Sequence, residues 1–367
     1  MTGEYEQIPG WRHLRERYLA LWNRQVLDAL FIAHIQNLNQ RPPAPEPWMI
    51  GPGPDKYVDP ARFLRYVNWR QSQWNWHTDL FHYKTPSIGP NMFLSFCGAE
   101  PVYGATTVWY KPMINDLAEA DRVHFSENNR RWREHLDTVD YFVNACAGNE
   151  QIGTTDMGGP ADLISVLMGA ENFLIQTVEN PGRMRDFALR LAGECNQAFD
   201  IIYRKITSRN DGNANWMPMW SDRPMGSAQD DMAINFSPEL YRDVFLPALS
   251  VMAAHTGRTV LHWHDGCAHH LDAILGVEAI SLIQYGHDPN TGSFRDQLPA
   301  MQKIQAAGKI LFISCVDACD AEFFIDNLDP RGLAMIINTG TDEASKQMEE
   351  DCRKWTGRRL DQLASTG

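Results

Sequence analysis

The last hundred residues alternate between short apolar runs and segments whose apolar residues share one helical face. Four apolar runs of strand length begin near residues 259, 279, 309 and 332, and a helical segment follows each of them. Parallel strands need a crossover of about a dozen residues or more, which is usually a helix. The repeat of about 25 residues therefore predicts four parallel strands joined by helices.

The middle of the chain shows the same two periodicities less evenly. The pattern predicts strands at residues 152–157 and 216–220, helices at residues 163–168 and 187–206, and a weaker strand or loop at residues 231–236. Ser237 and Pro238 are typical of a helix N-cap and first turn, and Gly257 is typical of a helix end. We expect a further helix between them.

The first 140 residues are less regular. Their spacing predicts helices at residues 11–30, 59–76 and 128–144 and a short strand at residues 93–96, while proline-rich stretches at residues 41–48 and 51–54 interrupt regular structure. We expect one structural domain with two parts. Residues 1–140 would form an N-terminal helical and irregular elaboration that includes the first strands, and residues 141–360 the main part of the fold.

Strand candidates near residues 30, 94, 154 and 217 bring the expected strands to eight. The most economical prediction is an α/β fold, a single (β/α)8 TIM barrel carrying the N-terminal elaboration. An open doubly wound sheet is the alternative, but no G-x-G-x-x-G motif follows a predicted strand.

Charge and cysteine content narrow the class of protein. The chain has 367 residues with 33 Lys and Arg against 46 Asp and Glu, a net charge of -13. This balance argues against nucleic acid and anionic membranes as partners, because both require a basic face. The seven cysteines are odd in number and show no repeated C-x-x-C spacing, and the N-terminus has no signal-peptide pattern. We expect a cytoplasmic protein with reduced thiols; the sequence leaves a homodimer open.

Polar residues follow the apolar bodies of most predicted strands. In a (β/α)8 barrel, the chemistry lies at the carboxyl ends of the strands. The residues at or near these ends that we single out are Asp156, Trp216, Trp220, Asp230, His262, His264, Asp265, Tyr285, His287, Cys315 and Asn338. Their recurrence is difficult to explain by packing alone and favours an enzyme with a small-molecule substrate.

His262 and His264 alternate along a strand and therefore point to one face. With a cysteine from a neighbouring strand they would form a zinc site that keeps one position open. Cys315 is the preferred thiol and Cys267 the second choice. The alternative is that one histidine is a hydrogen-bonded barrel residue and the other lies in a loop; His269 and His270 are expected to face solvent or to begin a helix.

Three carboxylates are candidates for catalysis: Asp156, Asp230 and Asp265. A carboxyl group in an apolar pocket has a raised pKa and can donate a proton, although each of these residues could equally cap a helix. We assign substrate binding to Trp216, Trp220, Tyr285, His287 and Asn338.

Four stretches of the chain resemble the uroporphyrinogen decarboxylase superfamily. They are TTDMGGPADLISVLMG (154–169), INFSPELYRDVFLPAL (234–249), VLHWHDGCAHHLDAIL (260–275) and IQAAGKILFISCVD (304–317). The resemblance covers the C-terminal two-thirds and implies a single (β/α)8 barrel with a cleft at the carboxyl ends of its strands. The superfamily contains cofactor-free decarboxylases, whose arginine-rich N-terminal motif is not found here. It also contains cobamide-dependent methyltransferases, which hold zinc with an H-x-C pair and a later cysteine.

The methyltransferase branch implies a first zinc ligand at His262, with His264 at the position of the first cysteine. Where the later cysteine is expected the chain reads INTGTDE, with Asn338 and Thr339. This set is richer in imidazole and poorer in thiolate, which suits an oxygen substrate or another metal. The resemblance thus implies a metal-assisted transfer of a methyl group between a small O- or N-methylated substrate and a corrinoid protein. The alternatives are a cofactor-free decarboxylase or lyase acting on a small aromatic or heterocyclic acid, and a non-catalytic barrel that binds a corrinoid or tetrapyrrole.

Overall fold

A computed structural model describes residues 10–36, 42–51, 53–73, 78–81, 83–105 and 107–366, without the side chains of residues 32–36, 315 and 366. The fold is mixed α/β, with a six-stranded sheet in the order β1-β12-β11-β10-β9-β8. Every neighbouring pair in this sheet is parallel. Its strands are β1 (Phe31–Gln36), β8 (Gly226–Gln229), β9 (Thr259–His264), β10 (Ile280–Gly286), β11 (Ile310–Asp317) and β12 (Leu333–Asn338).

Shorter pairings lie beside this sheet. β2 (Tyr83–Lys84) pairs in parallel with β5 (Gln151–Ile152), and Gly153 forms a parallel bridge with Ala214 of β6 (Asn213–Ala214). β6 is antiparallel to β7 (Trp220–Ser221), and β3 (Pro101–Tyr103) is antiparallel to β4 (Val108–Tyr110).

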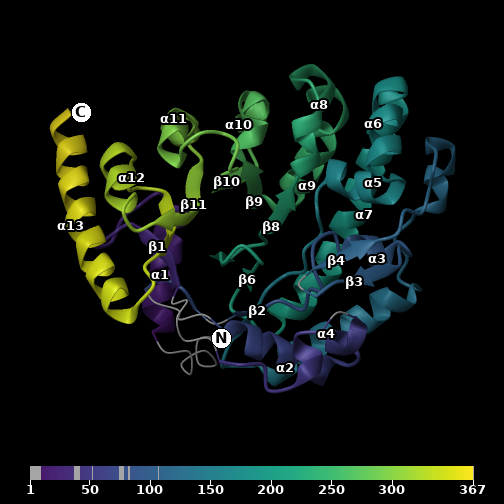
Figure 1. Ribbon diagram of the computed structural model, residues 1–367, viewed down its shortest axis with the longest axis horizontal. Coiled ribbons are helices and arrows are strands. Elements are labelled where there is room, and N and C mark those ends of the chain that lie inside the picture. Colours follow the sequence, from purple (N-terminus) through teal and green to yellow (C-terminus); the bar gives the residue numbers. More distant parts are fainter. Residues whose placement is uncertain are drawn as a thin grey trace.

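Helices surround the strands (Figure 1). The α-helices are α1 (Trp11–Trp22), α2 (Pro60–Gln71), α3 (Phe93–Phe96), α4 (Arg130–Ala145), α5 (Pro160–Met168), α6 (Ala170–Glu179), α7 (Pro181–Thr207), α8 (Pro238–Val244), α9 (Leu246–Thr256), α10 (Leu271–Leu275), α11 (Leu298–Ala306), α12 (Ala321–Asn327) and α13 (Asp342–Thr366). The 3-10 helices are η1 (Pro47–Met49), η2 (Pro54–Tyr57), η3 (Leu117–Arg122), η4 (Asp231–Asn235), η5 (Asp265–His270) and η6 (Phe294–Gln297). None of the helices in the described ranges is long and apolar enough to cross a membrane.

Capping groups fix the ends of several helices, and those expected at Ser237 and Gly257 are confirmed. The Asp59 side chain accepts a hydrogen bond from the Arg62 amide at 2.8 Å, which fixes the start of α2. Ser237 caps α8 through the Leu240 amide at 3.2 Å. Gly257 ends α9 in the left-handed conformation, with a φ of 67° that favours glycine.

Four short predictions differ from the structure. Residues 93–96 form the helical turn α3 and not a strand, because a run of four residues is too short to show a period that separates the two structures. Residues 231–236 contain η4, and only Trp220–Ser221 of residues 216–220 is strand. The strand predicted at residues 152–157 stops at Ile152, and the buried segment after it leads into α5.

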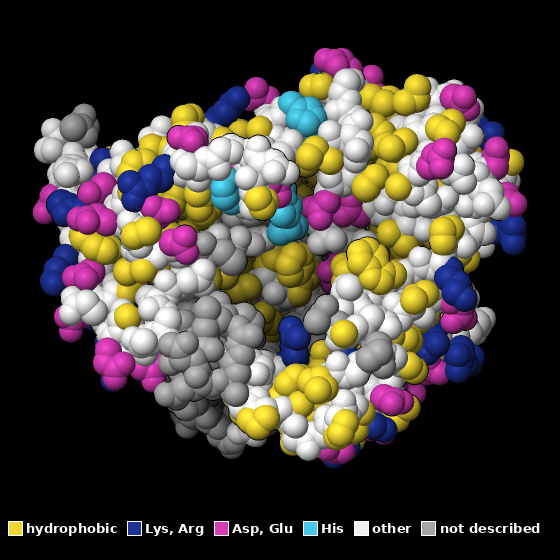
Figure 2. All heavy atoms as spheres, in the orientation of Figure 1, with side chains coloured by type: hydrophobic (Ala, Val, Ile, Leu, Met, Phe, Trp, Pro, Cys, Tyr) yellow, Lys and Arg dark blue, Asp and Glu magenta, His cyan; other side chains and the backbone are white. Residues whose placement is uncertain are grey.

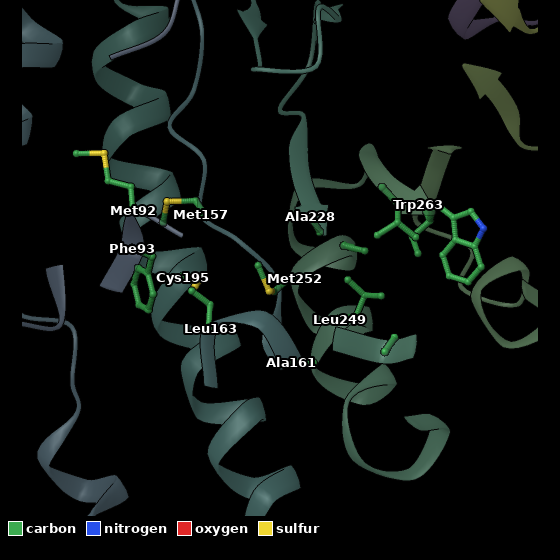
Figure 3. Packing of buried hydrophobic residues seen from close by; sticks show 14 of the residues in the cluster. Met92, Phe93, Met157, Ala161, Leu163, Cys195, Ala228, Leu249, Met252 and Trp263 are labelled. Atoms are coloured by element: carbon green, nitrogen blue, oxygen red, sulfur yellow. The ribbon is translucent and has the colours of Figure 1, made fainter. Parts of the chain in front are cut away.

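Side chains of the sheet divide between two hydrophobic layers. In β9, Leu261 and Trp263 belong to the layer shared with the helices, part of which is shown in Figure 3 with Leu249 and Met252 of α9. Val260 belongs to a second cluster on the opposite face. Because successive strand residues point to opposite faces, His262 and His264 share the face of Val260.

The second cluster lies at the amino ends of the strands and is covered by α1. Trp11 and Tyr18 of α1 contact the Trp220 ring at centroid distances of 5.2 and 6.1 Å. Arg17 is buried beneath them and pairs with Asp79. Apolar contacts and a buried ion pair therefore hold α1 against this end of the sheet.

Candidate metal centre at the carboxyl ends of the strands

Two imidazoles meet at the end of β9. His262 Nε2 and His264 Nε2 lie 2.9 Å apart, and both side chains are half-buried. The other nitrogen of each ring, Nδ1, also forms a hydrogen bond. His262 Nδ1 bonds to Gln284 Oε1 of β10, and His264 Nδ1 bonds to Asp288 Oδ1 at 2.8 Å. The pair therefore has fixed orientations and directs both Nε2 atoms to one point.

The hydrogen bonds at the two Nδ1 atoms indicate that neither Nε2 atom carries a proton. A carboxylate only accepts, so Asp288 fixes the proton of His264 on Nδ1, and a neutral His264 has a lone pair on Nε2. With its oxygen toward His262, Gln284 does the same for the second ring. Burial lowers the pKa of His262, which favours the neutral ring. Two lone pairs that face each other at this distance favour a cation between them.

A carboxylate completes the group. The ligand atoms of Asp231, His262 and His264 all lie within 4.8 Å of one another. Asp231 is exposed and begins η4, directly after β8. Two imidazoles and one carboxylate form a nitrogen and oxygen donor set that suits Zn²⁺ and several other divalent ions. Figure 2 shows histidine and acidic side chains at the edge of a hollow whose bottom is hydrophobic.

A second His–Asp pair joins the ends of β9 and β10. Here the carboxylate follows β9 and the histidine follows β10, the reverse of the His264–Asp288 pair. Asp265, which follows β9, accepts from His287 Nδ1 at 2.6 Å and from the Asp288 amide at 2.9 Å. In return, Asp288 accepts from the Gly266 amide at 3.2 Å. A Cβ on Gly266 would lie 2.7 Å from Asp288 Oδ2, which explains glycine in the HDG sequence. Asp265 thus orients a loop.

The position of Asp231 is set by a reciprocal contact between η4 and α5, which we call the α5–η4 lock. Asp230 Oδ1 accepts from the Ala161 amide at 2.7 Å, and Asp162 Oδ1 accepts from the Met232 amide at 2.8 Å. The second oxygen of Asp230 accepts from the Tyr241 hydroxyl at 2.9 Å. Burial raises the pKa of both carboxyls, that of Asp162 to about 7. Asp230 therefore has a clear structural role as a helix cap.

Asp156 is buried close to this lock. It accepts a hydrogen bond from the Gly158 amide at 2.8 Å, across a turn that needs the positive φ of that glycine. Burial, with a smaller contribution from the charge of Asp231, raises the pKa of Asp156 to about 6. A carboxyl group with this pKa can give and take a proton near neutral pH.

The other predicted residues are divided between the site and the core. Trp216 lies beside His262, with ring centroids 5.5 Å apart, and Asn338 is half-buried at the end of β12. Trp220 is fully buried in the cluster under α1, at the opposite ends of the strands. Tyr285 is fully buried in the helix-facing layer, where it stacks on Phe294.

The cysteine predictions have different outcomes. Cys315 lies in β11, but its side chain is outside the described residues. The Cys267 thiol is buried and its pKa is raised to about 12, so it stays protonated.

His269 and His270 differ in burial. His269 is exposed, whereas His270 is buried and hydrogen-bonded to the Ala233 carbonyl at 2.9 Å. Of the two alternatives expected for these histidines, His269 faces solvent, and His270 lies at the start of a helix as the N-cap of α10.

Sequence reasoning did not select Asp231, Gln284 or Asp288 as site residues. Gln284 was detectable, because it alternates with Leu282 on the inner face of a mostly apolar strand. Asp231 directly follows Asp230 in the sequence, and no periodic pattern separates the capping member of this pair from the exposed one. Asp288 lies in a loop, which carries no such pattern.

Comparisons with known proteins show what the fold is similar to. No family model matches the sequence, and no curated protein matches it. The structure is similar to that of a methyltransferase from Methanosarcina mazei, with a TM-score of 0.58 and 14% sequence identity. The similarity covers 93% of this chain and 98% of that chain. At this identity, the likeness establishes a shared fold.

Proposed function

We propose that this chain is a metal-assisted, methyltransferase-like enzyme. It would move a methyl group between a small O- or N-methylated substrate and a corrinoid carried by a partner protein. The observation that carries the proposal is the pair of histidine Nε2 atoms 2.9 Å apart, with the carboxylate of Asp231 beside them. Each imidazole is oriented by a hydrogen bond at its Nδ1 atom. The sequence resemblance and the fold shared with a methyltransferase support the type of reaction.

The proposal includes a closed (β/α)8 barrel. Its support is the six-stranded parallel sheet together with the parallel pairing of β2 with β5 and the bridge from Gly153 to Ala214. In such a barrel the site lies where substrates bind in this fold, at the carboxyl ends of the strands.

Asp231, His262 and His264 would hold the metal, for which we propose zinc. When bound, such an ion supplies Lewis-acid polarisation of the substrate heteroatom. Gln284 and Asp288 keep the two imidazoles in the tautomer that leaves Nε2 unprotonated.

Two further residues would act on the substrate directly. As the methyl group leaves, the heteroatom keeps the electron pair of the broken bond and takes a proton, which Asp156 can supply. The Trp216 ring would form an apolar wall beside His262 and exclude water.

Cobalt binding tests the metal site. Co²⁺ added to the metal-free protein should bind one ion per chain and give the weak visible absorption of a nitrogen and oxygen site. Asp231→Ala and His262→Ala should each weaken binding by more than about 100-fold, and Asp288→Asn by about 10- to 100-fold through the support of His264. His13→Ala, an exposed histidine on α1, is the matched control and should bind normally. Equal binding by all four variants would contradict the metal centre.

A transfer assay tests the reaction itself. The zinc-loaded protein, mixed with reduced cobalamin and a panel of methylated amines and phenyl methyl ethers, should form methylcobalamin with at least one of them. Chelation should abolish the reaction and added zinc should restore it. A protein that binds zinc at the site but methylates no corrinoid would overturn the methyl transfer and leave the metal site standing.

The raised pKa of Asp156 also favours a second candidate function, a cofactor-free decarboxylase or lyase. The buried carboxyl would then protonate the carbanion that remains after carbon dioxide leaves. Turnover of a small aromatic or heterocyclic acid that survives chelation and is lost in Asp156→Asn would select this function.

A further inference from the structure

The dipeptide His-Asp occurs at the ends of two neighbouring strands, as residues 264–265 at the end of β9 and as residues 287–288 after β10. The carboxylate of Asp288 accepts a hydrogen bond from His264 Nδ1 at 2.8 Å and one from the Gly266 amide at 3.2 Å. The carboxylate of Asp265 accepts from His287 Nδ1 at 2.6 Å and from the Asp288 amide at 2.9 Å. Each aspartate thus bonds to a histidine and to a backbone amide of the other strand end. We call this reciprocal arrangement the His–Asp clasp.

The outer half of the clasp, Asp265 with His287, is firmly enclosed. The Asp265 side chain has no exposed surface, and that of His287 is 24% exposed. The His287 ring stacks on Phe294 of η6, with centroids 4.8 Å apart and ring planes inclined by 16°. A buried carboxylate is costly unless its hydrogen bonds are made, so Asp265 holds both the imidazole and the Asp288 amide. The outer half therefore fixes the backbone of Asp288.

The inner half, Asp288 with His264, belongs to the imidazole pair. Because a carboxylate only accepts, Asp288 keeps the proton of His264 on Nδ1 and leaves Nε2 free. It does so from a backbone position that Asp265 fixes. A continuous series of hydrogen bonds therefore runs from the His287 ring to the His264 ring. Outer partners of this kind orient the residues that bind a metal directly.

We propose that Asp265 and His287 are positioning residues of the metal centre, which act through Asp288 on His264 and contact neither metal nor substrate. This inference rests on the metal centre proposed above. Among the described residues, the group of three whose ligand atoms lie close enough to share an ion does not include His287. The geometry thus favours support of the site over direct ligation.

Two substitutions of His287 separate support from direct contact. The side-chain amide of asparagine has a donor in place of Nδ1 and nothing in place of Nε2. His287→Asn should therefore keep the bond to Asp265 and bind Co²⁺ as the wild type does. His287→Leu has no donor and should weaken binding by about 10- to 100-fold, the usual effect of losing an outer partner. His255→Leu, which removes a His–Asp pair on the surface with Asp200, is the matched control and should bind normally.

A second measurement needs no metal. In the metal-free chain with ¹⁵N-labelled histidine, NMR shows which ring nitrogen of His264 carries the proton. The wild type and His287→Asn should have this proton on Nδ1, and His287→Leu should show a mixture of the two tautomers. An unchanged His264 tautomer in His287→Leu would overturn the proposal. So would a His287→Asn variant that binds Co²⁺ as weakly as His287→Leu, because Nε2 would then act directly. If the tautomers change as expected but the wild type binds no cobalt, the metal centre is refuted and the support of His264 by the clasp is confirmed.

Discussion

The carboxyl group of Asp156 is held by the Gly158 amide in surroundings that oppose its ionisation. Its pKa in the fold is about 6, whereas an aspartate in the unfolded chain has a pKa of about 3.9. The folded protein therefore binds more protons than the unfolded chain between these two values. In this window the contribution of Asp156 to the free energy of unfolding falls as the pH rises.

We predict that Asp156→Asn removes this pH dependence. The wild-type protein should lose about 3 kcal/mol of stability relative to the variant as the pH rises from 3.5 to 7, because each unit of pKa shift corresponds to about 1.4 kcal/mol. Urea unfolding at several pH values measures the difference. Asp186→Asn, which replaces an exposed carboxylate, is the control and should follow the wild type. Parallel curves for wild type and Asp156→Asn would refute the prediction.

At the scale of elements, the contact between α5 and η4 depends on Gly159. A Cβ built on this residue would lie 1.6 Å from the Gln229 carbonyl oxygen at the end of β8, so any side chain forces the two backbones apart. The same movement would break the bonds from Asp230 to Ala161 and from Asp162 to Met232.

Gly159→Ala should therefore destabilise the protein by about 3 kcal/mol or more and weaken cobalt binding, since Asp231 moves with η4. Gly193→Ala is the matched control. This glycine lies within α7 with open space around its Cβ position, and the substitution should stabilise the helix by about 0.5 to 1 kcal/mol. Thermal unfolding and Co²⁺ titration measure both effects. A fully stable Gly159→Ala variant that binds metal normally would show that the lock does not position Asp231.

The sequence predicts elements well where one face is buried over a long stretch. The four C-terminal strands and the cap of α8 follow from apolar runs and from Ser237, because these signals are local. The two residues of β2 and the four of β8 were not expected, because such short strands are fixed by neighbours distant in sequence. For the same reason His262 and His264 could be paired from their alternation, whereas Gln284 and Asp288 depend on the register of β10 against β9.

At the scale of the whole molecule, Arg17 joins α1 to the amino end of the sheet. Its guanidinium contacts Asp79 and donates to the Leu30 carbonyl at 2.8 Å, and Arg17 and Asp79 are both buried. Taking one partner away leaves the other buried charge uncompensated.

We predict that Arg17→Met destabilises the protein by about 3 to 5 kcal/mol, and that Arg17→Met combined with Asp79→Leu recovers much of this loss because no buried charge remains. Chemical denaturation of the two variants tests both statements. Arg15→Met, on the exposed side of α1, should cost less than about 1 kcal/mol. A double variant no more stable than Arg17→Met would show that the contacts of Arg17 with the backbone dominate.

The pairing of β1 with β12 joins the first and the last strand of the part of the chain that the structure describes. During synthesis β1 leaves the ribosome about three hundred residues before β12, a delay of roughly 15 to 60 s at ordinary rates of translation. Throughout that interval, this side of β1 lacks its permanent neighbour and is open to pairing with other nascent chains. The same topology that completes the mature sheet therefore leaves an unpaired strand edge on each nascent chain until β12 has been made.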